Sequence, residues 1–245
     1  MALLRLTQVT KTFGSGAGEF RALDKVDFEL LPQEVVAVMG PSGSGKTTLL
    51  TIAGALQHPT SGVVEVDGQE IQGLSQIELS VVRRRKIGFI FQSFNLLDAL
   101  SAKENVEFAL KLAGHTGKHM RERSRMLLSM LELGHRQDEL PKRLSGGERQ
   151  RVAVARALAN DGNVIMADEP TASLDQTRAV DLLLLLRGIR RDLGRSVLLV
   201  THDMRAHDHA DRIFWLEDGK LAPIAHGEAH VRPHKPGDIP PVLPE

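Results

Sequence analysis

A chain of 245 residues with 42% hydrophobic residues can bury a substantial core, which excludes a peptide, a fibre and a disordered tail protein. Its 31 basic and 31 acidic side chains give a formal net charge of zero, so no broad positive field favours nucleic acid or anionic lipid. The absence of cysteine excludes disulfides and thiol catalysis, and the longest purely apolar run, 182–186, is far shorter than the roughly 20 residues of a membrane-spanning helix.

Short strand patterns fill the first ninety residues. The unbroken apolar run at 35–39 predicts a strand buried on both faces, whereas alternation of apolar and polar residues predicts half-exposed strands. Asp67 and Gly68 have the sequence of a tight hairpin turn. The predicted strands are the half-exposed 4–9 and 26–30, the buried 35–39 and 87–91, and a hairpin over 63–71.

The hydrophobic period becomes helical from about residue 94 to 144. Ser101 and Glu104 have the spacing of a capping box, in which side chain and backbone satisfy each other's unpaired groups, so a helix is predicted to begin there. A second amphipathic stretch at 120–133 ends at Gly134, which predicts a helical insert. The apolar face of the first helix is expected to carry Val106, Ala109, Leu110 and Ala113.

Three further buried strands are predicted at 164–167, 197–201 and 213–216, with helical segments between them. This alternation favours an α/β fold with a parallel sheet covered by helices. The last twenty residues, 226–245, hold five of the eleven prolines and are predicted to form an extended tail. Histidines repeat there every four residues, but Pro233 interrupts the turn, so no metal site is expected from His226, His230 and His234.

The clearest chemical signal is a glycine-rich segment that follows the buried strand at 35–39. Glycines let the backbone fold around an anion, so that N–H groups and a helix start point at phosphate oxygens. Lys46 can then neutralise the β- and γ-phosphates, Thr47 can bind Mg²⁺ and Thr48 can bond the α-phosphate. A plain turn is the alternative, which eight residues in this context disfavour: Gly40, Pro41, Ser42, Gly43, Ser44, Gly45, Lys46 and Thr47.

The apolar stretch 163–167 ends in two carboxylates, Asp168 and Glu169. Because alternate residues of a strand face opposite ways, the two side chains can serve different purposes at one strand end. We assign Asp168 to Mg²⁺, through water, and Glu169 to the water that attacks the γ-phosphorus, as a general base or an orienting group. The alternative is a solvated acidic turn before Pro170, which the glycine-rich loop disfavours.

A second helix start suited to an anion occurs at 144–148. Ser145 and Glu148 have capping-box spacing, which alone indicates an ordinary helix that reaches about Ala159. Gly146 and Gly147 weaken its first turn by up to ~1 kcal/mol each relative to alanine, which is tolerable where a phosphate approaches the backbone. The chain therefore has one glycine-rich phosphate loop and, far away in sequence, a second helix start that suits an anion. It is open at this point which molecule's phosphate the second site binds.

In these motifs the chain resembles the ATP-binding subunit of ABC transporters. The segment 144–158, LSGGERQRVAVARAL, is similar to the family's signature motif, and the glycine-rich loop and the two carboxylates are similar to its Walker motifs. Taken alone, Phe13 fits plain core packing, and Gln92 and His202 fit locally bonded or surface side chains. The resemblance instead implies an adenine-stacking aromatic at Phe13, a Mg²⁺-contacting glutamine at Gln92, a nucleotide-site loop at Ser173, Leu174 and Asp175, and a γ-phosphate contact at His202.

The resemblance also implies a fold and a mode of assembly. The fold is a RecA-like P-loop NTPase with an N-terminal antiparallel β subdomain and an α-helical insert. Two subunits face head to tail, and each ATP lies between the Gly40 loop of one and the Ser145 helix of the other, near Gly146 and Gly147. The expected boundaries are an ATPase domain over 1–225, with its core at 1–92 and 145–225 and its helical subdomain at about 93–144, and a tail at 226–245.

Within the family, the segments 14–30 and 91–106 look like the lipoprotein-release and macrolide-efflux (LolD/MacB-like) subfamily. This implies a homodimer at the cytoplasmic face of the inner membrane that powers an integral-membrane permease of the FtsX/MacB type, with a periplasmic adaptor as a further partner. The permease's coupling helix is expected in a groove lined by 94–98. The segment 170–175 departs from the PTGNLD of many members. The alternative is a non-transporting ATPase that regulates a membrane-bound cell-envelope or division complex; no nucleic-acid partner is expected.

Overall fold

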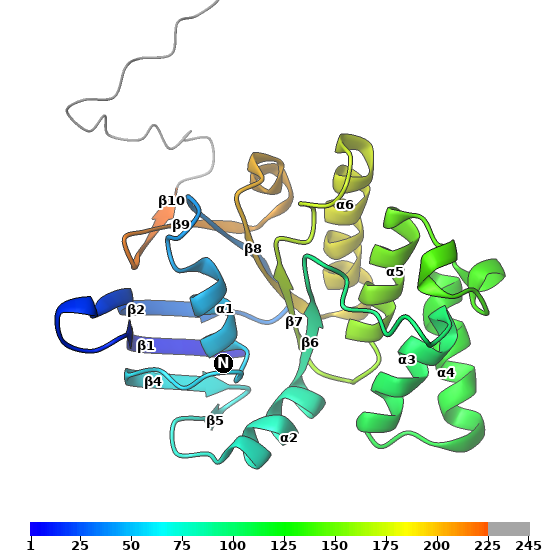
Figure 1. The fold of residues 1–245 in the computed structure, drawn as a ribbon, viewed down its shortest axis with the longest axis horizontal. Helices are drawn as coiled ribbons and strands as arrows, with labels where there is room; N and C mark the ends of the chain where they lie inside the picture. Colours follow the sequence, from blue (N-terminus) through cyan, green and yellow to red (C-terminus); the bar gives the residue numbers. More distant parts are fainter. Residues whose placement is uncertain (225–245) are drawn as a thin grey trace, which may run out of the picture.

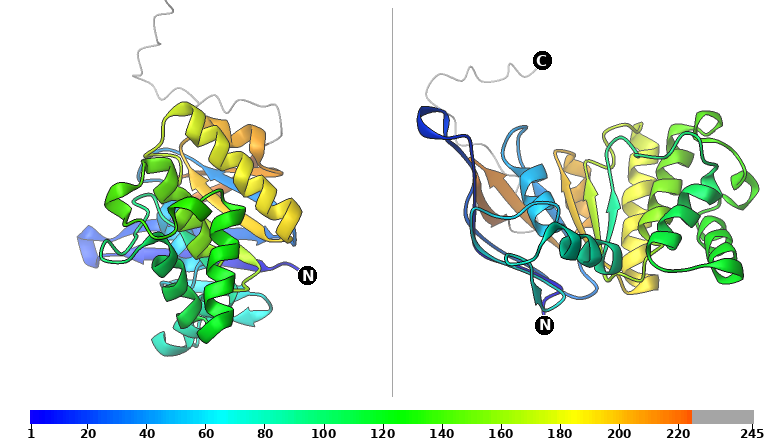
Figure 2. Two further views of the ribbon diagram at one scale, coloured as in Figure 1. Left: turned by 90° about the vertical axis from the view of Figure 1, so that its right-hand side faces the viewer. Right: turned by 60° about the horizontal axis from the view of Figure 1, so that its bottom comes forward.

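A computed structural model describes residues 1–224, so the predicted tail and its histidines lie outside the described residues. Three parts follow one another in space: a four-stranded antiparallel sheet, a six-stranded sheet, and a group of helices (Figure 1). The right-hand view of Figure 2 gives the same order, with the six-stranded sheet in the middle. The predicted α/β architecture with an antiparallel N-terminal part and a helical part is confirmed.

The antiparallel sheet has the strand order β2-β1-β4-β5 and the central sheet the order β10-β9-β3-β8-β7-β6. The strands are β1 (Leu4–Phe13), β2 (Phe20–Leu30), β3 (Val35–Met39), β4 (Ser61–Val66), β5 (Gln69–Glu70), β6 (Ile87–Ile90), β7 (Val164–Asp168), β8 (Ser196–Thr201), β9 (Arg212–Glu217) and β10 (Lys220–Ile224). The helices are α1 (Lys46–Ala53), α2 (Gln76–Lys86), α3 (Ala102–Leu112), α4 (Gly117–Met130), α5 (Gly146–Ala157) and α6 (Gln176–Leu193).

Strand β3 is buried on both faces, as its apolar run predicts. Val36 and Val38 belong to the core between the two sheets, which also contains the apolar side chains of α1. Val35 and Met39 belong to the core on the other face, beneath α5 and α6. The two-residue period of a strand explains this division, because alternate side chains leave the sheet on opposite sides.

Five strands of the central sheet run parallel, and β3 pairs with both β8 and β9. Met39 lies opposite Thr201, and Asp168 lies opposite Val200, so the carboxyl ends of β3, β7 and β8 meet at one edge of the sheet. The sequence prediction lacks β10, which pairs antiparallel with β9 at the edge of the sheet. The edge formed by the strand ends positions the candidate site.

The antiparallel sheet confirms the alternating patterns and the hairpin. Side chains at 26–30 alternate between buried and exposed, and β1 alternates in the same way until a register shift after Leu6. Strands β4 and β5 form the expected hairpin, and the positive φ angles of Asp67 and Gly68, 50° and 73°, fit a type I′ turn.

The helical part begins where the capping box predicts. Ser101 accepts a hydrogen bond from the backbone of Glu104, and α3 starts at the next residue. Val106 and Leu110 of α3 share one apolar core with side chains of α4 and α5. Apart from the helix that follows the glycine-rich loop, the sequence prediction has only strands before residue 90. It is wrong at α2, which carries its own capping box at Ser75.

Candidate functional site

The glycine-rich loop follows β3 and is confined between two strands. Gly40 has φ 154°, and a Cβ atom there would lie 2.1 Å from the carbonyl oxygen of Leu216 in β9. Gly45 has φ 105°, and a Cβ there would lie 2.3 Å from the carbonyl oxygen of Ala22 in β2. Only glycine fits both places, because any side chain would meet backbone. The loop then passes directly into α1 at Lys46.

Lys46 is buried inside the curve of this loop. Its Nζ atom donates hydrogen bonds to the carbonyl oxygens of Gly40 at 2.8 Å and Pro41 at 2.9 Å. Burial lowers the pKa of Lys46, and the charges of Glu169 and Asp168 act in the opposite direction. The ammonium group is therefore held at the loop, where it is available to a polyanion.

A buried serine hydroxyl adds to the anion-binding character of the loop. The Oγ atom of Ser44 is buried and has no hydrogen-bond partner among the described residues. A buried hydroxyl without a partner carries a free-energy cost, which a hydrogen bond to a ligand would remove. The loop thus offers a hydroxyl donor together with its backbone N–H groups and the Lys46 cation.

Two oxygen donors lie beside the loop where a divalent cation fits. Thr47 Oγ1 donates a hydrogen bond to Asp168 Oδ1 at 3.4 Å. Burial raises the pKa of Asp168, and the Glu169 charge adds to this, while the Thr47 hydrogen bond and Lys46 lower it. Mg²⁺ commonly takes one or two protein oxygens and completes its coordination with water and substrate phosphates, so this donor set fits Mg²⁺.

Glu169 makes a different set of contacts from its neighbour Asp168. Its backbone has φ 44°, an uncommon value for a residue other than glycine, and its N–H donates to the carbonyl of Val200. Its Oε2 atom accepts hydrogen bonds from Thr201 Oγ1 at 3.0 Å and from the backbone N–H of His202 at 3.2 Å. The ring atom Nδ1 of His202 lies 2.9 Å from the same oxygen. The two carboxylates thus face different groups, as the sequence predicts.

A cavity of about 330 Å³ opens over the glycine-rich loop. Lys46, Thr47 and Glu169 line it. Asp168 and His202 do not line it, but each contacts a residue that does: Asp168 contacts Thr47, and His202 contacts Glu169. Phe13 is not among the described residues that line the cavity. The residues that do line it are Phe20, Ala22, Ser42, Gly43, Gly45, Lys46, Thr47, Thr48 and Glu169.

The Ser145 helix start forms a separate site. Ser145 Oγ accepts a hydrogen bond from the Glu148 backbone at 3.3 Å, and Glu148 Oε2 accepts one from the Ser145 backbone at 2.7 Å, so the predicted capping box is present. Ser145 and Gly147 line a second cavity of about 220 Å³ between α5 and α6. None of the described residues that line this cavity also lines the first one.

The remaining predicted positions Gly146, Asp175 and Gln92 are not among the described residues that line either cavity. A Cβ on Gly147 would lie 3.3 Å from the Arg178 side chain, whereas a Cβ on Gly146 would meet nothing within 4 Å. Asp175 caps α6 by accepting a hydrogen bond from the Arg178 backbone at 3.1 Å. Gln92 lies exposed after β6, and its carbonyl accepts a hydrogen bond from Ser173 at 3.2 Å.

Sequence reasoning missed two side chains at the first site. Thr201 is the last residue of β8, and its hydroxyl both donates to Glu169 and accepts from the Asp203 backbone. Phe20 begins β2 and lines the cavity over the loop. Thr201 could have been found from the sequence, because it is a polar residue at the end of a buried strand. The position of Phe20 could not, because it depends on the long-range pairing of β2 with β1.

Comparison with known proteins places these observations in a family. A family model described as ABC transporter matches residues 23–172. The macrolide export ATP-binding/permease protein MacB of Hyphomonas neptunium is 46% identical over 219 residues, which cover 89% of this chain and 34% of that protein. An ABC transporter ATP-binding protein of Thermotoga maritima is 43% identical over 222 residues, which cover 91% of this chain and 94% of that protein. The chain spans about one third of the length of the MacB relatives.

A solved structure has the same fold at similar identity. It is a dimeric structure of a post-hydrolysis state of an ATP-binding cassette bound to ADP and Pi. Its TM-score against this chain is 0.82 at 41% sequence identity, and the match covers 89% of this chain and 96% of that one. A second dimeric structure, of a bacterial ABC transporter cassette, matches with the same values.

Proposed function

Because the chain belongs to the ABC transporter family as an ATP-hydrolysing cassette, we propose that two copies bind ATP between them and drive a membrane permease. The observation that carries the proposal is the separation of two anion-suited backbone sites on one chain. The Gly40 loop and the Ser145 helix start line different cavities, so we infer that a phosphate held by one meets the other on a second copy. The dimeric solved cassettes support this arrangement.

The phosphate groups of ATP would lie over the Gly40 loop. Backbone N–H groups and Ser44 would donate to phosphate oxygens, Thr48 would bond the α-phosphate, and Lys46 would neutralise the β- and γ-phosphates. We assign Thr47 and Asp168 to Mg²⁺, with Gln92 as a further contact, and Mg²⁺ when bound neutralises charge on the phosphates. Phe13, as the sequence resemblance implies, belongs to the base end of the same site.

Hydrolysis needs a water molecule aligned with the γ-phosphorus. Glu169 would orient this water and take up its proton as the water oxygen bonds to phosphorus and the bond to the bridging oxygen breaks, giving ADP and phosphate. His202 would contact the γ-phosphate and hold Glu169. The distance of 2.9 Å between its ring atom Nδ1 and Glu169 Oε2 supports this role.

The second copy would complete each site from the Ser145 helix. The Ser145 hydroxyl accepts the capping hydrogen bond from the Glu148 backbone and also bonds the Glu148 carboxylate, and it would turn from that carboxylate to donate to the γ-phosphate of the other copy's ATP. Gly146 and Gly147 leave the backbone of the first turn open to that phosphate, and Asp175 lies at the neighbouring start of α6. Cleavage would remove the γ-phosphate that joins the two copies and let the dimer open.

The partner we propose is a permease of the FtsX/MacB type, joined by a periplasmic adaptor, with this chain at the cytoplasmic face of the inner membrane. Within residues 1–224, no helix is both long and apolar enough to cross a membrane. The matched MacB proteins are named as combined ATP-binding and permease proteins, which supports a permease partner over the regulatory alternative.

A groove between the central sheet and the helical part supports this partner. It has a volume of about 400 Å³ and is lined by apolar side chains such as Phe89 and Phe91, together with Arg83, Arg84 and Arg156. Arg156 donates to the carbonyls of 94 and 95, within the segment that the sequence resemblance assigns to permease docking. None of the described lining residues is acidic, so we propose that the docking segment combines an acidic side chain with a large apolar one.

Phosphate release from ATP by the purified chain tests the proposed function. The wild-type chain with Mg²⁺ is expected to release phosphate, and Lys46→Ala is expected to abolish release and weaken ATP binding because the cation at the loop is lost. Release that persists in Lys46→Ala would contradict the proposed site.

A further inference from the structure

The cavity between α5 and α6 contains a buried amide without a partner. Gln150 of α5 is 1% exposed and lines this cavity together with Ser145 and Gly147. Neither its Nε2 atom nor its Oε1 atom has a hydrogen-bond partner among the described residues. A buried amide without partners costs free energy, which a ligand or an ordered water molecule in the cavity would offset. The cavity therefore has the polar wall of a binding site.

Arg178 of α6 lies against the first turn of α5. A Cβ placed on Gly147 would meet three atoms of the Arg178 side chain, Cδ at 3.3 Å, Nε at 3.6 Å and Cγ at 3.9 Å. Arg178 lines the same cavity as Ser145 and Gly147, and its side chain is 54% exposed. A guanidinium group therefore lies beside the helix start that we assign to the γ-phosphate of the other copy's ATP.

The charge of Arg178 is only loosely held by a neighbour. Its Nη1 atom lies 3.2 Å from Oδ2 of Asp175, and the two side chains are 54% and 55% exposed. An ion pair this exposed contributes little to stability, so it costs little to share or to break. Because a guanidinium group has five N–H donors, Arg178 can keep Asp175 and still donate to a phosphate.

The other charged side chains of the cavity wall are paired or lie further along α6. Glu148 and Arg151 each form an ion pair with another residue, at 3.0 Å and 2.6 Å. Asp181 follows Arg178 by about one turn of α6. Arg178 is thus the cation that the cavity presents at the Gly147 turn.

We propose that Arg178 donates to the γ-phosphate of the ATP held on the second copy, beside Ser145 and Gly147. This inference rests on the proposed ATP dimer and adds a positively charged contact to it. A serine hydroxyl and backbone N–H groups are neutral donors, whereas a guanidinium can meet a phosphate with two parallel, charge-assisted hydrogen bonds. The amide of Gln150 then bonds water enclosed with the phosphate. ADP has no γ-phosphate, so Arg178 favours the dimer with ATP.

The dimer that Glu169→Gln forms with Mg·ATP tests the role of this charge. Arg178→Met keeps a long side chain against Gly147 but removes the charge, so we expect the dimer dissociation constant to rise about tenfold or more. Arg178→Lys keeps a cation and should lose less. Analytical ultracentrifugation measures the dimer. The Kd for ADP should stay unchanged in both variants, because Arg178 is not among the described residues that line the cavity over the Gly40 loop.

A second background separates a direct contact from repulsion by Asp175. Arg178→Met leaves the Asp175 carboxylate without its cation, and that negative charge would itself repel a phosphate. Asparagine caps helices as well as aspartate does, so Asp175→Asn keeps the start of α6 and removes the charge. Arg178→Met should weaken the ATP-dependent dimer by about the same factor in this background.

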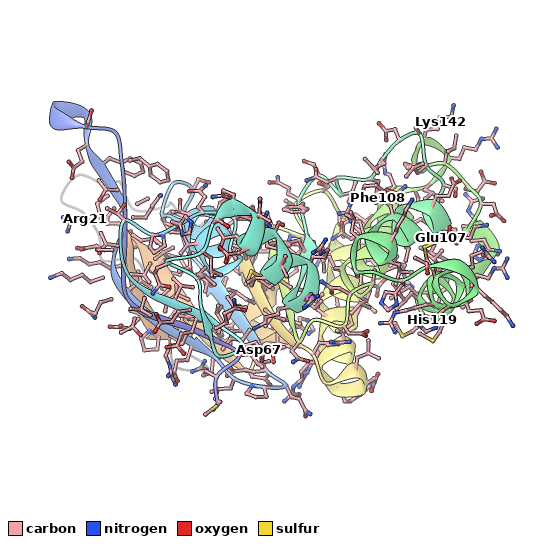
Figure 3. The ribbon with its side chains drawn as sticks, turned by 90° about the horizontal axis from the view of Figure 1, so that it is seen from below. Arg21, Asp67, Glu107, Phe108, His119 and Lys142 are labelled. Atoms are coloured by element: carbon pink, nitrogen blue, oxygen red, sulfur yellow. The ribbon has the colours of Figure 1, made fainter. Side chains whose placement is uncertain are left out.

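Two other cations serve as controls. Arg187 lies on α6 and Lys142 lies shortly before Ser145; both are exposed, and neither is among the described residues that line the cavity. Figure 3 shows the Lys142 side chain at the outer edge of the helical part. Arg187→Met and Lys142→Met should leave the dimer dissociation constant unchanged.

Several results would overturn the role of Arg178. They are an unchanged dimer in Arg178→Met, an equal loss in Arg178→Lys, no further loss in the Asp175→Asn background, weaker ADP binding in Arg178→Met, or an equal loss in Arg187→Met or Lys142→Met. Failure of Glu169→Gln itself to dimerise with ATP would be a different outcome, because it would overturn the proposed function.

Discussion

The Nδ1 atom of His202 lies 2.9 Å from Oε2 of Glu169, an oxygen that also accepts hydrogen bonds from Thr201 Oγ1 and the His202 backbone. The other carboxylate oxygen, Oε1, lies 3.9 Å from Lys46 Nζ. The end of β8 thus fixes one oxygen of Glu169, and the second lies near the phosphate-binding loop. This geometry suits a carboxylate that must hold one water molecule in a single position.

Removing the contacts from β8 should slow hydrolysis more than it weakens ATP binding. Thr201→Val keeps the shape of the side chain but removes one donor to Glu169, so we expect turnover to fall about tenfold. His202→Ala removes a ring that contacts both Glu169 and the proposed γ-phosphate position, so a fall of about 10²-fold is expected. Single-turnover phosphate release and the Kd for ATP are the measurements; a loss confined to affinity would contradict this role.

Asp168→Asn should stabilise the free protein. Burial, with the Glu169 charge, raises the pKa of Asp168, so the folded protein binds this proton more tightly than the unfolded chain. The free energy of unfolding therefore falls as pH rises from the ordinary pKa of an aspartate through the raised one, and the charged carboxylate costs stability above both. At neutral pH we expect Tm to rise by about 2 °C.

Asp168→Asn should also lose the thermal stabilisation that Mg·ATP gives to the wild-type protein. Melting curves with and without Mg·ATP are expected to show ligand stabilisation in the wild type and little in Asp168→Asn, because a Mg²⁺ contact is lost. A lower Tm for Asp168→Asn without ligand would refute the burial cost, and full ligand stabilisation would refute the Mg²⁺ assignment.

Two matched capping boxes separate structure from function in the signature helix. Ser101 and Ser145 each cap a helix by the same hydrogen-bond pair, so replacing either with alanine should cost about 1 kcal/mol of stability. Only Ser145→Ala should also weaken an ATP-dependent dimer, because only Ser145 lies at the proposed second anion site. Urea unfolding measures the loss of stability, and analytical ultracentrifugation with ATP measures the dimer. Equal dimerisation of both variants would contradict the contact between Ser145 and the ATP of the other copy.

These capping boxes also give a pH dependence. Hydrogen bonds from the capping serines, the backbone N–H first, lower the pKa of Glu104 and of Glu148. Each box therefore contributes its stability above the ordinary glutamate pKa and loses it as pH falls through the lowered one. Ser101→Ala should reduce the acid-induced part of the loss in unfolding free energy, and an unchanged pH profile would argue against the capping contribution.

The arginines of the groove should matter for coupling to a permease and not for basal hydrolysis. Arg84 lines the groove, whereas the exposed Arg85 on the same helix is not among its described lining residues. Arg84→Glu is expected to reduce the stimulation of phosphate release by a MacB-type permease in vesicles several-fold, through repulsion of an acidic docking segment. Arg85→Glu is the matched control, and equal stimulation in both variants would argue against the groove.

Local patterns predicted the elements with one regular apolar face and the motifs that we assign to ligand binding through the backbone. The β3 run, the Gly40 loop and the capping boxes at Ser101 and Ser145 are all read within a few residues, and all occur as expected. Helix α2 was missed because its apolar residues are few, although Ser75 and Glu78 signal its start.

Other features depend on contacts between distant segments. Strand β10 is half-exposed at a sheet edge and pairs only with β9, so its sequence lacks the apolar run of a central strand. The place of Phe20 at the cavity follows from its pairing with Phe13 and from the approach of the loop to β2, neither of which is a local property.

The ATP-dependent dimer of Glu169→Gln tests the central claim most directly. This variant keeps the shape of the side chain but cannot take up a proton, so ATP should bind and persist between two copies. Light scattering after size exclusion should give a dimer with Mg·ATP and a monomer without nucleotide, with no phosphate released. A monomer under both conditions, with ATP bound, would contradict the shared site.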